Sequence, residues 1–217
     1  MNNNHVIMQI KNKELVDINK VMKNTFMLLS STIAFSTFTA LIGIIHKNSY
    51  ALPCFIISFL LLFFINVIKQ NAIRLFLVFI ITGLLGYSTG PLINFVLHTK
   101  NGEELIFMSL FITAGSFFLL SIYTIITKKN FQFLNSFLFI GFIIIVFCIL
   151  SNIIFNIHIL HLIISGFIII SSAATILYTL SEIIHSNEHD YISATITLYL
   201  QIYNIFLSLL NIFTRKD

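Results

Sequence analysis

Long apolar runs dominate the chain, and short polar connections separate them. Seven runs approach or exceed the roughly 20 residues that a helix needs to cross the hydrocarbon core of a membrane; they are residues 25–45, 51–68, 75–97, 105–126, 131–155, 159–184 and 191–213. These runs use most of the 217 residues. The pattern therefore predicts an all-α integral membrane protein, a bundle of seven transmembrane helices without a separate soluble domain.

Polar segments flank the predicted membrane domain at 25–213. Residues 1–24 contain four lysines and lack the apolar core and cleavage site of a signal peptide, which predicts a cytoplasmic N-terminal tail. Residues 214–217 form a short C-terminal tail. Apolar residues at helical spacing in the second half of the N-terminal tail leave two structures open, a helix on the membrane surface and a solvated tail.

The distribution of lysine and arginine predicts the orientation. With the N-terminus in the cytoplasm, eight of these residues lie on the inner side and four on the outer side, as the positive-inside rule requires. Seven spans then place the C-terminus in the periplasm. A re-entrant last hairpin would change the distribution to ten against two and keep the C-terminus inside.

Polar residues form a stripe along each of the last two predicted helices. The first stripe comprises Ser165, Ser172, Thr175, Thr179 and Glu182; the second comprises Asp190, Ala194, Thr197, Gln201, Asn204, Ser208 and Asn211. Both keep the near-3.5 period of a helix-packing seam. In an antiparallel pair Thr179 lies opposite Gln201, and Glu182 lies within a turn of it. We therefore predict a polar core between these helices, formed by Thr179, Glu182, Thr197, Gln201 and Asn204.

Glu182 is a carboxylate inside a predicted span, close to its inner end. An ionisable residue within a membrane is a candidate for function. A side chain so near the end of its helix can also reach water. Both interpretations stay open from the sequence.

Glycine and proline interrupt the third predicted span. Pro91 follows Gly86 and Gly90, so we expect a kink there and close backbone contact with a neighbouring helix. Residues 86–90 also match the G-x-S-x-G pattern of a catalytic serine. That pattern requires a turn between a strand and a helix, whereas this segment lies within an apolar run, so packing explains it better.

The remaining chemistry predicts neither a metal site nor a cofactor. His185, Glu188, His189 and Asp190 could bind a divalent metal, but a polar connection between two spans explains them more simply. No catalytic constellation is evident, which predicts a protein that is not an enzyme. Only 9% of the residues are charged, against 58% hydrophobic, and no basic run indicates a nucleic-acid partner. The predicted surroundings are the lipid bilayer.

Four segments resemble the Bax inhibitor family: residues 23–29 (KNTFMLL), 83–94 (GLLGYSTGPLIN), 161–165 (HLIIS) and 191–206 (YISATITLYLQIYNIF). The resemblance extends from about residue 20 to residue 211 and is strongest to a bacterial inner-membrane branch. It implies a seven-helix bundle with a central seventh helix.

For this branch the resemblance also implies a function. The protein would bind the membrane-anchored ATP-dependent protease FtsH, be degraded slowly by it and restrain its action, with the tail from Met1 to Lys20 as the handle. The alternative is a pH-sensitive cation or calcium leak channel. Channel-like relatives carry a pair of aspartates at the positions of Thr179 and Gln201, and that pair is absent here.

Overall fold

All seven apolar runs contain a helix, and the described residues contain no other regular secondary structure. The computed structural model describes residues 3–46, 50–155, 157–185 and 190–214. The helices are α1 (Asn3–Ile45), α2 (Ala51–Phe64), α3 (Asn71–Leu97), α4 (Gly102–Thr127), α5 (Leu134–Phe155), α6 (His158–His185) and α7 (Tyr191–Thr214).

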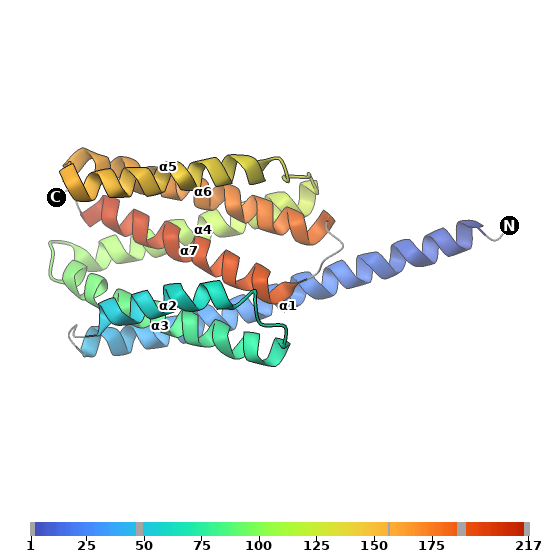
Figure 1. Ribbon diagram of the computed structural model, residues 1–217, viewed down its shortest axis with the longest axis horizontal. Coiled ribbons are helices and arrows are strands. Elements are labelled where there is room, and N and C mark those ends of the chain that lie inside the picture. Colours follow the sequence, from blue (N-terminus) through green and yellow to red (C-terminus); the bar gives the residue numbers. More distant parts are fainter. Residues whose placement is uncertain (1–2, 47–49, 156, 186–189, 215–217) are drawn as a thin grey trace.

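The helices form three layers, with α7 in the middle (Figure 1). On one side α1 and α2 pack against α3, and on the other side α4 and α5 pack against α6. Helix α7 contacts α1, α3, α4 and α6. Its buried side chains consequently lie around much of its circumference; among them are Ile192, Thr195, Ile196, Leu198, Tyr199, Ile205 and Leu210. The predicted central position of the seventh helix is confirmed.

The outer surface is apolar, as expected of a protein surrounded by lipid. Large hydrophobic side chains are exposed along the outer helices, for example Phe107, Leu119, Phe139 and Phe142. Within the part of the chain that the structure describes, six helices are long and apolar enough to cross a membrane. The chain is therefore a multi-pass helical membrane protein.

The second predicted span is shorter than the sequence indicated. Helix α2 has 14 residues and ends at Phe64, which gives a length of about 21 Å, against the roughly 30 Å of a hydrocarbon core. The apolar run continues to Ile68, but the backbone turns after Phe64. Ile65, the first residue after the helix, is buried. Its carbonyl oxygen accepts a hydrogen bond from Arg74 Nε at 3.1 Å. The fifth span likewise begins at Leu134 rather than at residue 131.

Helix α1 is continuous across the predicted boundary between tail and membrane domain. It begins at Asn3 and continues to Ile45, and its N-terminal part projects beyond the rest of the bundle (Figure 1). Val21 and Met22 already pack against the hydrophobic core. The bundle therefore starts a turn before residue 25, and the segment before it is a helix rather than a solvated coil.

The chain ends of the bundle separate into two groups. The projecting part of α1 lies at the same end as the α2–α3 and α4–α5 connections and the start of α7 (Figure 1). We call this the N-terminal end of the bundle. The last turn of α7 lies at the opposite end (Figure 1).

Candidate functional site

Helices α1 and α3 approach closely because glycines face each other at their crossing. A Cβ atom on Gly43 would overlap the carbonyl oxygen of Tyr87, and one on Gly90 would overlap the backbone of Gly43. A Cβ atom on Gly86 would overlap the carbonyl oxygen of Ser36. The close contact expected of Gly86 and Gly90 is thus present, and its partner is α1.

Pro91 lies within α3, which continues to Leu97. Proline has no N–H group, so the carbonyl oxygen of Tyr87, four residues earlier, lacks its helical donor. This is the oxygen that lies against Gly43. A Cα–H group of glycine is a weak donor at helix contacts. Gly43 is therefore placed to provide a weak donor to the oxygen that Pro91 leaves without its helical donor. The kink at Pro91 itself stays a prediction.

Tyr199 on α7 joins the central helix to both members of this pair. Its side chain is 3% exposed. The hydroxyl is hydrogen-bonded to Ser36 Oγ of α1 and lies 3.3 Å from the carbonyl oxygen of Thr82 on α3, which accepts from it. Tyr203, one turn further along α7, stacks on the Tyr199 ring. Three helices therefore meet at one buried hydroxyl.

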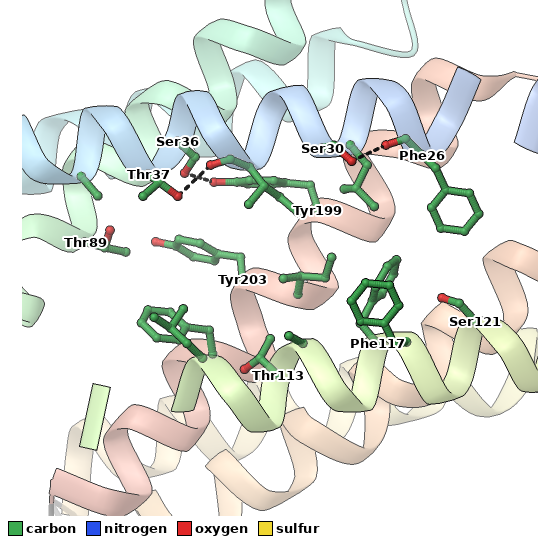
Figure 2. A pocket seen from close by; sticks show the side chains of 18 of the residues that line it. Phe26, Ser30, Ser36, Thr37, Thr89, Thr113, Phe117, Ser121, Tyr199 and Tyr203 are labelled. Carbon is green, nitrogen blue, oxygen red and sulfur yellow. Dashed lines mark hydrogen bonds between the residues drawn. The ribbon is translucent and has the colours of Figure 1, made fainter. Parts of the chain in front are cut away.

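Beside this junction lies a groove of about 700 Å³. One wall is α1 and the other is α4, with α7 as the floor and α3 at one end (Figure 2). Several lining residues are exposed, including Ser30, Thr37, Leu110, Ala114 and Phe118. The groove therefore opens sideways between α1 and α4, into the space that lipid occupies.

The lining of the groove is apolar, with hydroxyl groups as its polar atoms. These belong to Ser30, Ser36, Thr37, Thr89, Thr113, Ser121, Tyr199 and Tyr203. No carboxylate, imidazole or thiol lies among the lining residues. A hydroxyl without a nearby base is a poor nucleophile. The lining is therefore suited to binding an apolar molecule.

A network of polar side chains closes the N-terminal end of the bundle. Arg74, at the start of α3, forms an ion pair with Asp190 and donates a hydrogen bond to Ser193 Oγ at 2.8 Å. Asp190 caps α7 by accepting from the backbone N–H groups of Ile192 and Ser193 at 3.1 and 3.2 Å. Ser193 Oγ in turn donates to Asn66 Oδ1 at 3.1 Å. This network, which we call the clasp, ties α7 to α3 and to the connection between α2 and α3.

The clasp sets the ionisation of Asp190. Partial burial raises the pKa of its carboxyl, but hydrogen bonds from Arg74 and Ser193 and the charge of Arg74 outweigh that effect and hold the pKa below its ordinary value. The charged form is thus the one that the folded protein favours.

The polar seam between α6 and α7 is present in part. Ser165, Ser172 and Thr179 of α6 are buried, as are Ala194 and Ser208 of α7. Thr197, Gln201 and Asn204 are half-buried. Among the described residues, a hydrogen bond joins Asn211 Nδ2 of one stripe to Ser165 Oγ of the other at 3.3 Å. It lies at the opposite end of the hairpin from the predicted contact between Glu182 and Gln201.

Glu182 does not belong to a buried polar core. It is exposed, and its Oε1 atom accepts a hydrogen bond from the hydroxyl of Tyr178 on the same helix at 3.3 Å. A step of three residues from buried Thr179 rotates a side chain by about 60° around the helix. That rotation takes Glu182 off the buried face, so its predicted placement was wrong.

The predicted metal candidates give no site in the described part of the chain. Glu188 and His189 lie outside the described residues. Among the residues that are described, no group of three or more histidine, cysteine, aspartate or glutamate side chains could hold an ion. His185 instead makes a local contact, in which Nδ1 donates to the carbonyl oxygen of Ser181 at 2.9 Å. Asp190 is occupied by the clasp.

The sequence did not indicate which residues form the clasp and the Tyr199 junction, because the partners lie far apart along the chain. Arg74 and Asp190 are 116 positions apart, and Ser36 and Tyr199 are 163 apart. A tyrosine within an apolar run looks like an ordinary core aromatic. The position of Asp190 directly before the last apolar run is the signal that could have indicated the cap.

The fold and these sites define a class of protein, a multi-pass helical membrane protein whose last described helix is central and whose groove contains no catalytic group. Residues 18–217 match the sequence profile of the family described as "Inhibitor of apoptosis-promoting Bax1". The chain belongs to the Bax inhibitor family.

Bacterial relatives align over nearly the whole chain. A protein named "Modulator of FtsH protease YccA" from Escherichia coli K12 is 38% identical over 94% of both chains. An uncharacterised protein of Pseudomonas aeruginosa is 39% identical over 91% of this chain and 90% of its own. An uncharacterised membrane protein of Vibrio cholerae has the same identity and coverage.

Proposed function

We propose that this protein is a non-enzymatic modulator of an FtsH-type protease in the bacterial inner membrane, one that the protease engages and degrades slowly. The relative from Escherichia coli that is named a modulator of FtsH protease supports the proposal of modulation, since it aligns over 94% of the chain. The lining of the groove is consistent with a role that needs no catalysis.

The structural observation that carries the proposal is the continuity of α1. A processive protease grips a chain end that lies outside the folded domain. Residues 3–20 of α1 would reach about 27 Å beyond the first core contacts at Val21. This projecting part is the handle, from Met1 to Lys20, of which the first two residues lie outside the described range.

Slow degradation follows from the contacts of the helix to which the handle belongs. The first element to be extracted is the rest of α1, which the glycine contact joins to α3 and the Ser36 hydrogen bond joins to α7. Extracting α1 therefore requires breaking the buried junction at the centre of the bundle. The protease would be occupied by a substrate that resists unfolding from the end at which it is held.

We also propose that the N-terminal end of the bundle is cytoplasmic. Its exposed basic side chains include Lys20, Lys23, Lys69, Lys128 and Lys129, in agreement with the positive-inside rule. The last turn of α7 then lies on the periplasmic side. This orientation presents the handle to a protease whose ATP supply is in the cytoplasm.

A calcium leak, the alternative function, has less support. A path for divalent cations usually presents carboxylates. The family resemblance puts the aspartate pair at the positions of Thr179 and Gln201, which are both neutral here. Glu182 is exposed, and Asp190 is paired with Arg74.

Co-purification tests the partnership. The full-length chain carrying an affinity tag at its C-terminus, extracted from native membranes in mild detergent, should retain FtsH. An unrelated multi-pass protein expressed at the same level is the control. Recovery of FtsH at the level of the control would contradict the proposal.

Half-lives in cells test the handle. Removal of the residues before Lys20 should lengthen the half-life in cells with active FtsH, while membrane insertion stays intact. In the full-length chain Ser36→Ala should shorten the half-life, because it weakens the junction. Ser30→Ala, which loses only a bond to the Phe26 carbonyl oxygen on the same helix, is the matched control. Equal half-lives of the truncated and full-length chains would refute the role of the handle.

A further inference from the structure

We propose that the groove between α1 and α4 is a binding site for one anionic phospholipid of the leaflet at the N-terminal end of the bundle. One acyl chain would lie in the groove, with its ester group near Ser121 and its phosphate near Lys23. This inference is independent of the protease partner, because it rests on the groove, on Ser121 and on the charges at its mouth.

The volume of the groove selects a hydrocarbon chain over a partner helix. A helix about 10 Å in diameter would fill 700 Å³ within a length of about 9 Å, less than two turns. The groove extends much further along the bundle, from Phe26 to Ala40 on α1, which corresponds to about 21 Å. A site this long and narrow fits an extended chain, and the sideways opening gives lipid direct access.

Ser121 provides an independent indication of a ligand. It is 4% exposed, and its Oγ atom has no hydrogen-bond partner within the described residues. Buried hydroxyl groups are usually paired. Serine and threonine side chains elsewhere on α4 bond to their own helix, as Ser109, Thr113 and Thr124 do. In Figure 2 Ser121 projects from the α4 wall into the groove.

The depth of Ser121 fits the ester region of a phospholipid. It lies six residues before the end of α4 at Thr127, about 9 Å along the axis. Helix α4 has 26 residues and is about 39 Å long, so it exceeds the hydrocarbon core by about 4 to 5 Å at each end. Ser121 is therefore just inside the hydrocarbon boundary, where an ester carbonyl oxygen can accept its hydrogen.

Charge at the mouth of the groove favours an anionic head group. Lys23 precedes Phe26 and Ser30 on α1 by steps of three and seven, which places it on the face that forms the wall. Lys128 and Lys129 come directly after the last residue of α4 and are exposed. Basic residues between membrane helices at the cytoplasmic surface are a recurrent site for anionic head groups.

Photocrosslinking in vesicles tests the position of the chain. The full-length protein is reconstituted in phosphatidylcholine with a trace of phosphatidylglycerol that carries a diazirine in the middle of one acyl chain. We expect labels on Tyr203 of the central helix and on Ile33 and Ala114 of the walls. Labels spread over the outer helices in proportion to exposure, with α7 unlabelled, would overturn the proposal.

Paired variants test each part of the site. Ala114→Trp, within the groove, should reduce labelling of Tyr203 several-fold, whereas Gly115→Trp, whose Cβ would meet open space, should not. Lys23→Gln should reduce labelling by the phosphatidylglycerol probe to that of a phosphatidylcholine probe with the same chain. Lys100→Gln, at the opposite end, should change nothing. Equal labelling of the wild type by both probes would refute a site for anionic lipid.

The ester contact has its own test. The wild type should prefer an ester-linked probe to an ether-linked probe by roughly threefold, the factor of one hydrogen bond inside a membrane. Ser121→Ala should remove the preference and keep the labelled positions. If the wild type does not distinguish the two probes, Ser121 does not bind the ester group. Melting temperatures in detergent establish that each variant is folded.

Discussion

Single hydroxyl and carboxyl groups hold the helices of this protein together at two places. The buried hydroxyl of Tyr199 joins three helices near the centre, and the carboxylate of Asp190 joins two at the N-terminal end. The hydroxyl of Tyr199 costs free energy to bury and is stabilised by partners on two other helices, whereas the carboxylate of Asp190 is exposed and is stabilised by Arg74. Such contacts determine which faces of the helices pack together. Apolar side chains alone do not, because they pack about as well against lipid as against another helix.

The contact between Ser36 and Tyr199 predicts coupled effects on stability. Ser36→Ala and Tyr199→Phe should each lower the free energy of unfolding by roughly 0.5–1.5 kcal/mol, because each removes one partner of a buried bond. The double variant should lose less than the sum of the two, since both remove the same bond. Thermal unfolding in detergent measures this cycle, with the exposed Tyr123→Phe as the control. Strictly additive losses would mean that the two hydroxyls do not interact.

The clasp predicts a dependence of stability on pH. The pKa of Asp190 is lower in the folded protein than its ordinary value of 3.8, so the contribution of its charge is complete above that value and is lost as the pH falls through the folded pKa. Asp190→Asn keeps a capping oxygen without the charge. The melting temperature of the wild type should exceed that of the variant by a constant amount near neutral pH, and the difference should shrink in acid below 3.8. A difference that persists in strong acid would show that the charge is not responsible. Asp17→Asn, at an exposed position of α1, is the control.

At the level of helices, the α1–α3 contact depends on the absence of side chains. Gly43→Ala should destabilise the protein by roughly 1 to 3 kcal/mol, because its Cβ would overlap the carbonyl oxygen of Tyr87 and force the helices apart. Gly115→Ala should have the opposite sign and stabilise by up to about 1 kcal/mol, since it meets open space in a helix. The melting temperatures of the two variants in detergent test whether the two substitutions have opposite effects on stability. Similar shifts would indicate that glycine at the crossing has no special role.

Hydrophobic runs were sufficient to predict where the helices lie but not where each one ends. The run from residue 51 to residue 68 is mostly apolar, yet α2 ends at Phe64, because apolarity alone does not distinguish a helix from a turn. The glycine pair was predictable because small residues four apart in an apolar helix are typical of a close contact between membrane helices.

Periodicity predicted the seam between α6 and α7 correctly at one end of the hairpin. At the other end, Glu182 lies off the buried face of α6. Ser165 and Asn211 were assigned to it correctly, and Glu182 was not. The clasp and the Tyr199 junction were not predictable, since each depends on which distant helices pack together. The unpaired state of Ser121 likewise exists only in the folded bundle.

For the molecule as a whole, the two positions at which the family resemblance implies a proton-sensitive pair of aspartates carry neutral side chains. Thr179 and Gln201 cannot share a proton, so the coupled titration that gives a sharp pH switch has no physical basis. Proteoliposomes loaded with a calcium indicator should therefore show no strong leak that closes in acid. Empty liposomes are the control. A steep calcium flux that disappears on acidification would contradict this prediction and would direct attention to Glu182.

The central position of α7 also bears on the order of biogenesis. Helices enter the membrane in the order in which the ribosome makes them, so α1 to α6 are inserted before the helix on which both outer layers pack. Until α7 arrives, Ser36 lacks Tyr199, and Arg74 lacks Asp190 and Ser193. Before α7 is inserted, the two outer layers lack the helix that contacts both of them, so its insertion is the step that joins them.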